Sequence, residues 1–271
     1  VAARPMISEA SRLTYASSQG RLTVVGLGPG NAELLTQQVR NSIASATDAF
    51  GYFPYIERLS GLEHLTLHAS DNREELERAR AALHLAAQGK QVLMLSSGDP
   101  GVFAMASAVF EVLEYAAPDE QLLWQAVHIE VQPGITAMLA AAARLGAPLG
   151  HDFCTINLSD NLKPAEVIER RICLAAQADF AMAFYNPCSK SRPQGFERAL
   201  KVLRQECEPE RLICFARNVS RPDETLNVVP LAAASAEMAD MRTLVIVGNS
   251  LTRKVGPHVY TPRSYGVQAR G

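Results

Sequence analysis

Three strand-like segments of this 271-residue chain each lead straight into a glycine-rich turn. Residues 22–25, 92–95 and 128–131 are predicted strands, and turns at 26–30, 97–101 and 132–136 follow them. A helical pattern follows each turn. The repeated order of strand, turn and helix predicts an α/β fold with a mostly parallel sheet. Ligands of such sheets bind at the carboxyl ends of the strands, so the three turns predict one binding site.

The alternation of strands and helices restarts after residue 150, which indicates a second domain. Strands are predicted at 153–158, 180–185, 212–216 and 243–247, with helices at 164–176 and 194–205. We predict two α/β domains with mostly parallel or mixed sheets. The N-terminal domain covers 21–132 and the C-terminal domain 151–271, with a connecting helix and linker at 133–150. Residues 1–20 lack the apolar stretch of a signal peptide, and we expect a flexible N-terminal arm.

Two helices of the first half carry specific expectations. After the first turn, Asn31 is a candidate N-cap for a helix with Leu34, Leu35 and Val39 at helical spacing. A second helix over 72–88 is expected to bury Leu76 on its apolar face, and Gly89 is expected to end it.

Charge and cysteine content exclude several classes of function. A formal net charge of −2 and a pI near 6.3 argue against a nucleic-acid partner, which usually needs a basic face. No apolar run reaches the roughly 18 residues of a membrane span. The five cysteines are widely spaced with no C-x-x-C, so we expect no metal site and reduced thiols in a cytoplasmic protein.

The glycine turns do not fit a dinucleotide-binding fingerprint. The first has the spacing G-x-G-x-G with Pro29 inside it, and the fingerprint needs an acidic residue that ends the second strand. Asp48 stands at about the right distance but lies in a helix-like stretch, so a dehydrogenase is excluded. In the second turn, Asp99 could bind a ribose hydroxyl or a cation, or it could cap the following helix.

Six motifs resemble the tetrapyrrole methylase family, the class III S-adenosylmethionine-dependent methyltransferases. They are VVGLGPG at 24–30, SSGDPGVF at 96–103, PGITA at 133–137, AFYNPCSKSR at 183–192, ARNVSRPDE at 216–224 and LVIVGNS at 244–250. The resemblance covers nearly everything after residue 20. Within the family, the stretch at 150–172 is similar to enzymes of cobalamin biosynthesis that methylate C-17 of precorrin-3B and contract its macrocycle.

The resemblance implies S-adenosylmethionine as cofactor in a cleft between the domains, S-adenosylhomocysteine as product, and a homodimer. The residues that it assigns to the cofactor are Ser97, Gly98, Asp99, Val102, Thr136, Ala137, Phe184 or Tyr185, Asn218 and Gly248. It places Gly28, Pro29 and Gly30 of the first turn against the macrocycle instead.

The substrate carries many carboxylates, so cations are expected to bind it. The candidates, which could also be solvated loop charges, are Lys190, Arg192, Arg217 and Arg221. Ring contraction should need removal of a hydroxyl proton, which calls for a general base. The candidates in the stretch at 150–172 are His151, Asp152 and Asp160, although a surface histidine and capping aspartates would look the same.

Other functions remain open at this point. A relative in the same family could act on cobalt-factor III, precorrin-4 or uroporphyrinogen III, and a non-catalytic carrier could hold a nucleoside or a tetrapyrrole without turnover. No cysteine-rich extension follows Gly271, which favours a metal-free substrate over a cobalt-bound one.

Overall fold

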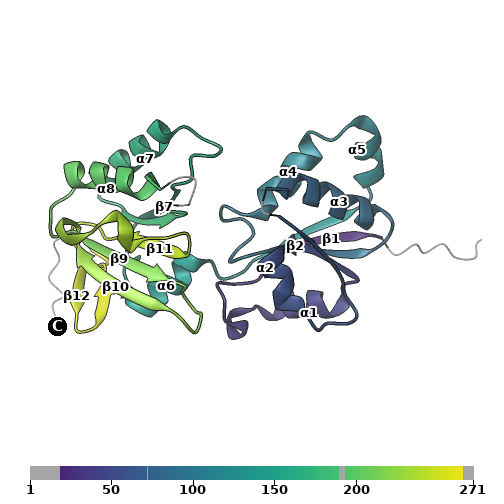
Figure 1. Cartoon of the computed structure of the whole chain (residues 1–271), viewed down its shortest axis with the longest axis horizontal. Helices are drawn as coiled ribbons and strands as arrows, with labels where there is room; N and C mark the ends of the chain where they lie inside the picture. Colours follow the sequence, from purple (N-terminus) through teal and green to yellow (C-terminus); the bar gives the residue numbers. More distant parts are fainter. Residues whose placement is uncertain (1–18, 72, 189–192, 265–271) are drawn as a thin grey trace, which may run out of the picture. The chain divides into compact units, whose positions relative to one another are not determined.

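The computed structural model describes residues 19–71, 73–188 and 193–264, which form two compact units (Figure 1). The described residues of the first unit are 19–25, 38–71, 73–96 and 105–132. Those of the second unit are 26–37, 97–104, 133–188 and 193–264. The chain therefore enters the second unit twice, through the first two glycine turns, before it stays there from residue 133.

The first unit has a five-stranded sheet in the order β3-β2-β4-β1-β5. Strand β1 runs parallel to β5, and β2 runs parallel to both β3 and β4, as the alternating pattern predicts. The strands are β1 (Arg21–Gly26), β2 (Asp48–Tyr52), β3 (Thr66–Ser70), β4 (Gln91–Ser96) and β5 (His128–Gln132).

Helices cover both faces of this sheet (Figure 1). They are α1 (Gln37–Ser45), α2 (Phe53–Ile56), α3 (Glu75–Ala87), α4 (Met105–Glu114) and α5 (Pro118–Trp124). The face under α3, α4 and α5 is filled by side chains such as Leu22, Met94, Leu83 and Val109, all fully buried. Burial of apolar area on this scale supplies most of the driving force for folding.

The second unit has a five-stranded mixed sheet in the order β10-β9-β11-β8-β7. Strands β7 and β8 are parallel, whereas β11 is antiparallel to β8 and β9, and β10 is antiparallel to β9. The strands are β7 (Phe153–Asn157), β8 (Ala181–Tyr185), β9 (Leu212–Arg217), β10 (Thr225–Pro230) and β11 (Thr243–Val247). A three-stranded sheet accompanies it, made of β12 (Arg253–Val255), β13 (His258–Tyr260) and β6 (Gly146–Ala147).

This second sheet lies between α7 (Ala165–Gln177) and α8 (Gly195–Glu206) on one face and α6 (Ala137–Leu145) on the other (Figure 1). Alternate residues of β8 face opposite ways, as strand geometry requires. Met182 and Phe184 join the core under α7 and α8, and Ala183 and Tyr185 face α6. The predicted fold class, α/β with parallel and mixed sheets, is confirmed.

Three local expectations were wrong. Asn31 caps only a 3-10 turn, Ala32–Leu34, by accepting from the Glu33 N–H at 2.9 Å, and the chain is extended at Leu35 before α1 begins. Asp48 is the first residue of strand β2 and does not lie in a helix. A dinucleotide site needs its acidic residue at the other, carboxyl end of that strand. Leu76 is 49% exposed, because the buried face of α3 is formed by Arg78, Ala79, Ala82, Leu83 and Ala86.

Several elements carry no clear signal in the sequence. Helix α5 is short and opens with Pro118, and β3 and β10 are half-exposed strands without a long apolar run. Our predicted division at 133–150 also differs from the grouping of the structure in one respect. The structure joins 26–37 and 97–104 to the second unit, because the backbones of the turns contact each other and residues after 132.

Candidate functional site

The three glycine turns meet because the strands before them are neighbours. Strands β4, β1 and β5 are adjacent in the sheet order, and their carboxyl ends carry the turns at 97–101, 26–30 and 132–136. Gly28 and Gly98 pair as an isolated antiparallel bridge, with N–H to carbonyl distances of 3.1 and 3.0 Å in the two directions. The first two turns are thus joined backbone to backbone.

Glycine is required where the third turn packs onto the other two. A Cβ on Gly134 would lie 2.1 Å from the carbonyl oxygen of Gly98 and 2.7 Å from that of Gly26. Real Cβ contacts do not reach such distances, and both neighbours are main chain that cannot rotate away. The spacing of these glycines therefore reflects close approach of three backbone segments, which a side chain would separate.

Asp99 fixes the second turn to the third. One carboxylate oxygen accepts from the Gly101 N–H at 2.8 Å, and the other accepts from the Gly134 N–H at 3.0 Å. The Val102 N–H donates to the Asp99 carbonyl at 3.2 Å, and Ser97, the first residue of the turn, is partly buried. The predicted cofactor residues of this segment lie in one tight structure, held by the carboxylate.

Tyr185 brings the end of β8 to the same place. Its hydroxyl is hydrogen bonded to the Thr136 hydroxyl and accepts from the Met138 N–H at 3.0 Å. Thr136 is the N-cap residue of α6 and Ala137 its first residue, so the phenol satisfies an N–H that the helix leaves open. Burial raises the pKa of Tyr185, and the nearby charge of Asp99 adds to this, so the phenol keeps its proton.

Phe103 lies against Tyr185 and was not predicted. Its ring is 47% exposed and meets the Tyr185 ring edge to face at 5.4 Å between centroids. Phe103 also has φ of +54°, a conformation that costs a bulky residue free energy and that clusters at functional sites. Neither the exposure nor the φ of Phe103 can be seen in the sequence, so sequence reasoning missed this residue.

Three predicted cofactor residues have other contacts in the structure. Phe184 is fully buried in the core under α7 and α8, so of the alternatives Phe184 and Tyr185 only the second offers its side chain at the site. The Asn218 side chain donates to Asp223 at 2.6 Å and holds its own loop, with φ of +49°. Gly248 packs closely on Thr252, and its carbonyl accepts from Arg211 at 3.0 Å.

The predicted substrate cations differ sharply in their surroundings. Arg217 donates to Asp240 at 2.8 Å and lies 4.0 Å from Asp223, so its charge is already paired. Arg221 is exposed, and its guanidinium forms no hydrogen bond or ion pair with the part of the chain that the structure describes; only its backbone is hydrogen bonded, to Asn218 and Glu224. Lys190 and Arg192 lie outside the described residues.

The side chain of Arg221 lies over the first turn. A Cβ on Gly30 would come 2.7 Å from the Arg221 Cγ and 3.2 Å from the Ser220 carbonyl. The loop that carries Arg221 is firmly built, because Glu224 accepts from the Ser220 N–H at 2.6 Å and from Arg144 at 2.8 Å. Turn 26–30, which also contains Gly28 and Pro29, therefore lies beside an exposed guanidinium.

The predicted general bases are not brought together with the turns. His151 and Asp152 precede β7, whose first residue pairs with Ala181, while Tyr185 stands at the other end of β8. Four residues of strand separate these ends by about 13 Å. The Asp152 side chain is 82% exposed, and its N–H donates to the His151 ring at 2.7 Å.

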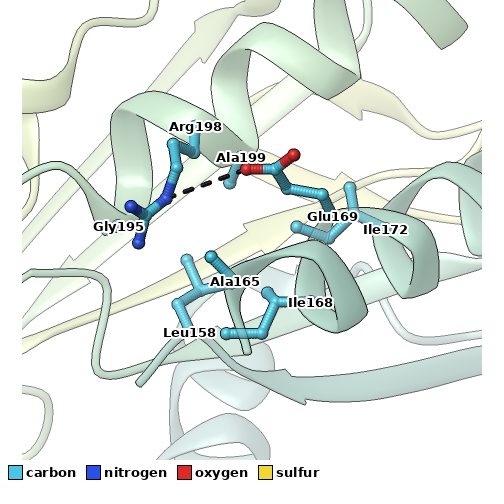
Figure 2. A pocket seen from close by; sticks show the side chains of 8 residues that line it. All are labelled: Leu158, Ala165, Ile168, Glu169, Ile172, Gly195, Arg198 and Ala199. Carbon is cyan, nitrogen blue, oxygen red and sulfur yellow. Dashed lines mark ion pairs between the residues drawn. The ribbon is translucent and has the colours of Figure 1, made fainter. Parts of the chain in front are cut away.

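Asp160 follows β7 at the right end, but its carboxylate accepts from Arg198 at 2.8 Å. Arg198 also lies 3.8 Å from Glu169 beside a pocket between α7 and α8 (Figure 2). That pocket has a volume of about 10 Å³, which has room for at most one water molecule and is too small for S-adenosylmethionine or a tetrapyrrole.

Three further observations concern metal ligands, membrane-spanning helices and the cysteines. Among the residues described, no three histidine, cysteine or acidic side chains group as metal ligands would, and no helix is long and apolar enough to cross a bilayer. The five cysteines are unpaired, and burial raises the pKa of Cys214 to about 12, so that thiol stays protonated.

Comparison with known proteins identifies the family. The family model of the Tetrapyrrole (Corrin/Porphyrin) Methylases matches residues 21–235. The chain is 51% identical over 251 residues to a Precorrin-3B C(17)-methyltransferase from Sinorhizobium sp, with 91% of this chain and 97% of that protein covered. It is also 60% identical to the crystal structure of the methyltransferase CobJ, with a TM-score of 0.86, 90% of this chain and 100% of that chain covered.

A third relative is the Cobalamin biosynthesis protein CobIJ of Mycobacterium tuberculosis. It is 44% identical over 254 residues, which cover 91% of this chain but only 48% of that longer protein. The family model, the near-complete match to the Sinorhizobium enzyme and the stacked glycine turns agree with one another. The chain belongs to the tetrapyrrole (corrin/porphyrin) methylases.

Proposed function

We propose that this methyltransferase moves a methyl group from S-adenosylmethionine to C-17 of precorrin-3B and contracts the macrocycle, as a step of cobalamin biosynthesis. The observation that carries the proposal is the 51% identity to a Precorrin-3B C(17)-methyltransferase over 97% of its length. The full-length match to CobJ supports the same assignment.

The residues around the stacked turns fit a nucleoside cofactor. Asp99 and the hydroxyl groups of Thr136 and Tyr185 are polar groups of the kind that bind ribose, and the exposed ring of Phe103 offers a face for a purine. We assign these four residues to the cofactor, with Gly98, Val102 and Ala137 as backbone or packing contacts. When bound, S-adenosylmethionine supplies an electrophilic methyl carbon on a sulfonium.

Positioning is the main contribution of the protein to methyl transfer. The electron pair of the macrocycle carbon forms the new bond to the methyl carbon, and sulfur keeps the pair of the broken bond. Holding the two reactants in line supplies several kcal/mol of the acceleration, on the order of 7–11 kcal/mol in the best cases. The rigid contacts of Asp99 and Tyr185 suit this task, because they join three turns and a strand end.

We assign the carboxylates of the macrocycle to Arg221, with Gly28, Pro29 and Gly30 beside it. The exposed guanidinium over Gly30 can bind a carboxylate in bidentate fashion, whereas the guanidinium of Arg217 is already paired. We also infer from the family resemblance that the enzyme works as a homodimer in the cytoplasm.

Turnover tests this function directly. The protein is incubated with methyl-labelled S-adenosylmethionine and precorrin-3B, and the product is followed by mass and absorbance spectra. We expect a labelled tetrapyrrole with a contracted macrocycle. Binding of both compounds without label transfer would make the protein a carrier, and selective methylation of cobalt-factor III would assign it to the cobalt-bound route.

A further inference from the structure

Two asparagines stand at the carboxyl ends of the parallel strands β7 and β8, where no function has been assigned. Asn157 is the last residue of β7 and pairs in register with Tyr185, the last residue of β8. Residues paired in this way point to the same face of a sheet, so Asn157 shares the face of Tyr185. Asn186 follows Tyr185 directly, which places both carboxamides next to the cofactor site proposed above.

The hydrogen bonds settle which way both carboxamides point. The Ser159 N–H donates to a side-chain atom of Asn157 at 2.9 Å, and because an N–H can only donate, that atom is Oδ1. The same oxygen lies 3.1 Å from the Asn186 side chain, so Nδ2 of Asn186 faces it. The Nδ2 of Asn157 and the Oδ1 of Asn186 are therefore directed away from this shared contact.

Those two remaining groups have no partner among the residues that the structure describes. Both side chains are only partly buried, and neither atom is sequestered from solvent. Asn186 also has φ of +52°, like Phe103 and Asn218 in the neighbouring segments of the same unit. With Ser220, these are four non-glycine residues with positive φ that lie in turns or just after strand ends of this unit, and such conformations cluster at functional sites.

We propose that Asn157 and Asn186 form a hydroxyl-binding pair for the tetrapyrrole, which rests on the function proposed above. The Asn157 Nδ2 donates a hydrogen bond to the hydroxyl oxygen, and the Asn186 Oδ1 accepts a hydrogen bond from the hydroxyl O–H. A carboxylate could use only the donor, and a pyrrole N–H only the acceptor, so a group with both capacities fits best. An amide does not remove the proton; the pair orients the hydroxyl that must lose it for the ring to contract.

The substitution Asn157→Asp tests the pair with little change to the fold. An aspartate keeps the oxygen that accepts from Ser159 and Asn186 and replaces the outward donor by an acceptor. The measurement is the dissociation constant, without S-adenosylmethionine, for precorrin-3B and for the corresponding tetrapyrrole without the hydroxyl. The wild type should prefer the hydroxyl form by about tenfold, equal to about 1.4 kcal/mol. The variant should show a smaller preference, because it loses the donor to the hydroxyl oxygen and keeps only the Asn186 acceptor.

The matched control is Asn227→Asp on β10, an exposed asparagine that gains the same charge. It should keep the wild-type preference, because added charge repels both tetrapyrroles alike. Asn186→Gly, which tolerates a positive φ, should show a smaller preference as well. An unchanged preference in Asn157→Asp, or no preference in the wild type, would overturn the proposal that the two asparagines bind the hydroxyl group. A wild type that fails to convert precorrin-3B overturns the proposed function, while the binding preference still decides on the pair.

Discussion

Asp99 is the residue on which the geometry of the proposed cofactor site depends most. Its two oxygens accept from Gly101 and Gly134, so Asp99→Ala would release the second turn from the third. We expect the dissociation constant for S-adenosylmethionine to rise at least about tenfold, consistent with two lost charge-assisted hydrogen bonds. Calorimetry measures this. Asp119→Ala, in the exposed first turn of α5, is the control, and a value within twofold of wild type for Asp99→Ala would contradict the role.

Arg221 and Arg217 give opposite predictions although they are four residues apart. Arg221→Ala should raise the KM for the tetrapyrrole several-fold and leave cofactor affinity unchanged, because the guanidinium is exposed over Gly30. Arg217→Ala should instead lower the thermal stability, since it leaves Asp240 without its cation. Steady-state kinetics and thermal unfolding of both variants separate the two roles. Equal KM changes in both variants would refute the distinction.

At the scale of elements, the three turns behave as one packed unit. Gly134→Ala would place a Cβ 2.1 Å from the Gly98 carbonyl, and neither segment can yield without breaking the stack. We expect loss of cofactor binding and a melting temperature lower by several degrees, as for a substitution that costs a few kcal/mol. Thermal unfolding and calorimetry check both effects.

Gly30→Ala is the matched variant in the first turn. The nearest atom to its Cβ is the Arg221 Cγ at 2.7 Å, part of a flexible side chain that can move. This variant should fold normally and bind the cofactor, but it should raise the KM for the tetrapyrrole because Arg221 is displaced. A Gly30→Ala protein as unstable as Gly134→Ala would show that the first turn has no more freedom than the third.

The sequence predicts the stacked turns, but it does not show the contacts between distant segments that complete the candidate site. Strand order and turn position follow from local patterns, so three turns on one sheet edge could be predicted from residues 26–30, 97–101 and 132–136. The Tyr185–Thr136 hydrogen bond and the positive φ of Phe103 depend on contacts between distant segments. His151 is a candidate for its residue type and its place in the stretch at 150–172, and the register of β7 puts it at the end of that strand opposite to Asn157, the partner of Tyr185.

At the scale of the whole molecule, low pH should reduce the free energy of unfolding through Glu208, a carboxylate of the second unit. Hydrogen bonds from Arg211 hold the pKa of Glu208 below its ordinary value. A carboxyl with a lowered folded-state pKa contributes stability that is present above its unfolded pKa and is lost as the pH falls through the folded value. The melting temperature should therefore fall as the pH drops below about 4.5.

Glu208→Gln tests this origin of the acid sensitivity. The variant should melt at a lower temperature than wild type at pH 7 and should show a flatter loss of stability between pH 5 and pH 3. Glu210→Gln, two residues further on, is the control, because Glu210 forms no ion pair with the described residues. Identical pH profiles for wild type and Glu208→Gln would assign the acid sensitivity to other carboxylates.

The assignment of the first two turns to the second unit has a consequence for synthesis on the ribosome. The residues that form the site are far apart in the sequence and are synthesised one after another: Gly28, then Asp99, then Tyr185 and last Arg221. When only the first half of the chain has left the ribosome, the first two turns lack the contacts that residues of the second half provide. Under the proposed assignment, binding of the tetrapyrrole requires that translation has passed Arg221 in the loop at 218–224, which makes tetrapyrrole affinity a measure of completed folding.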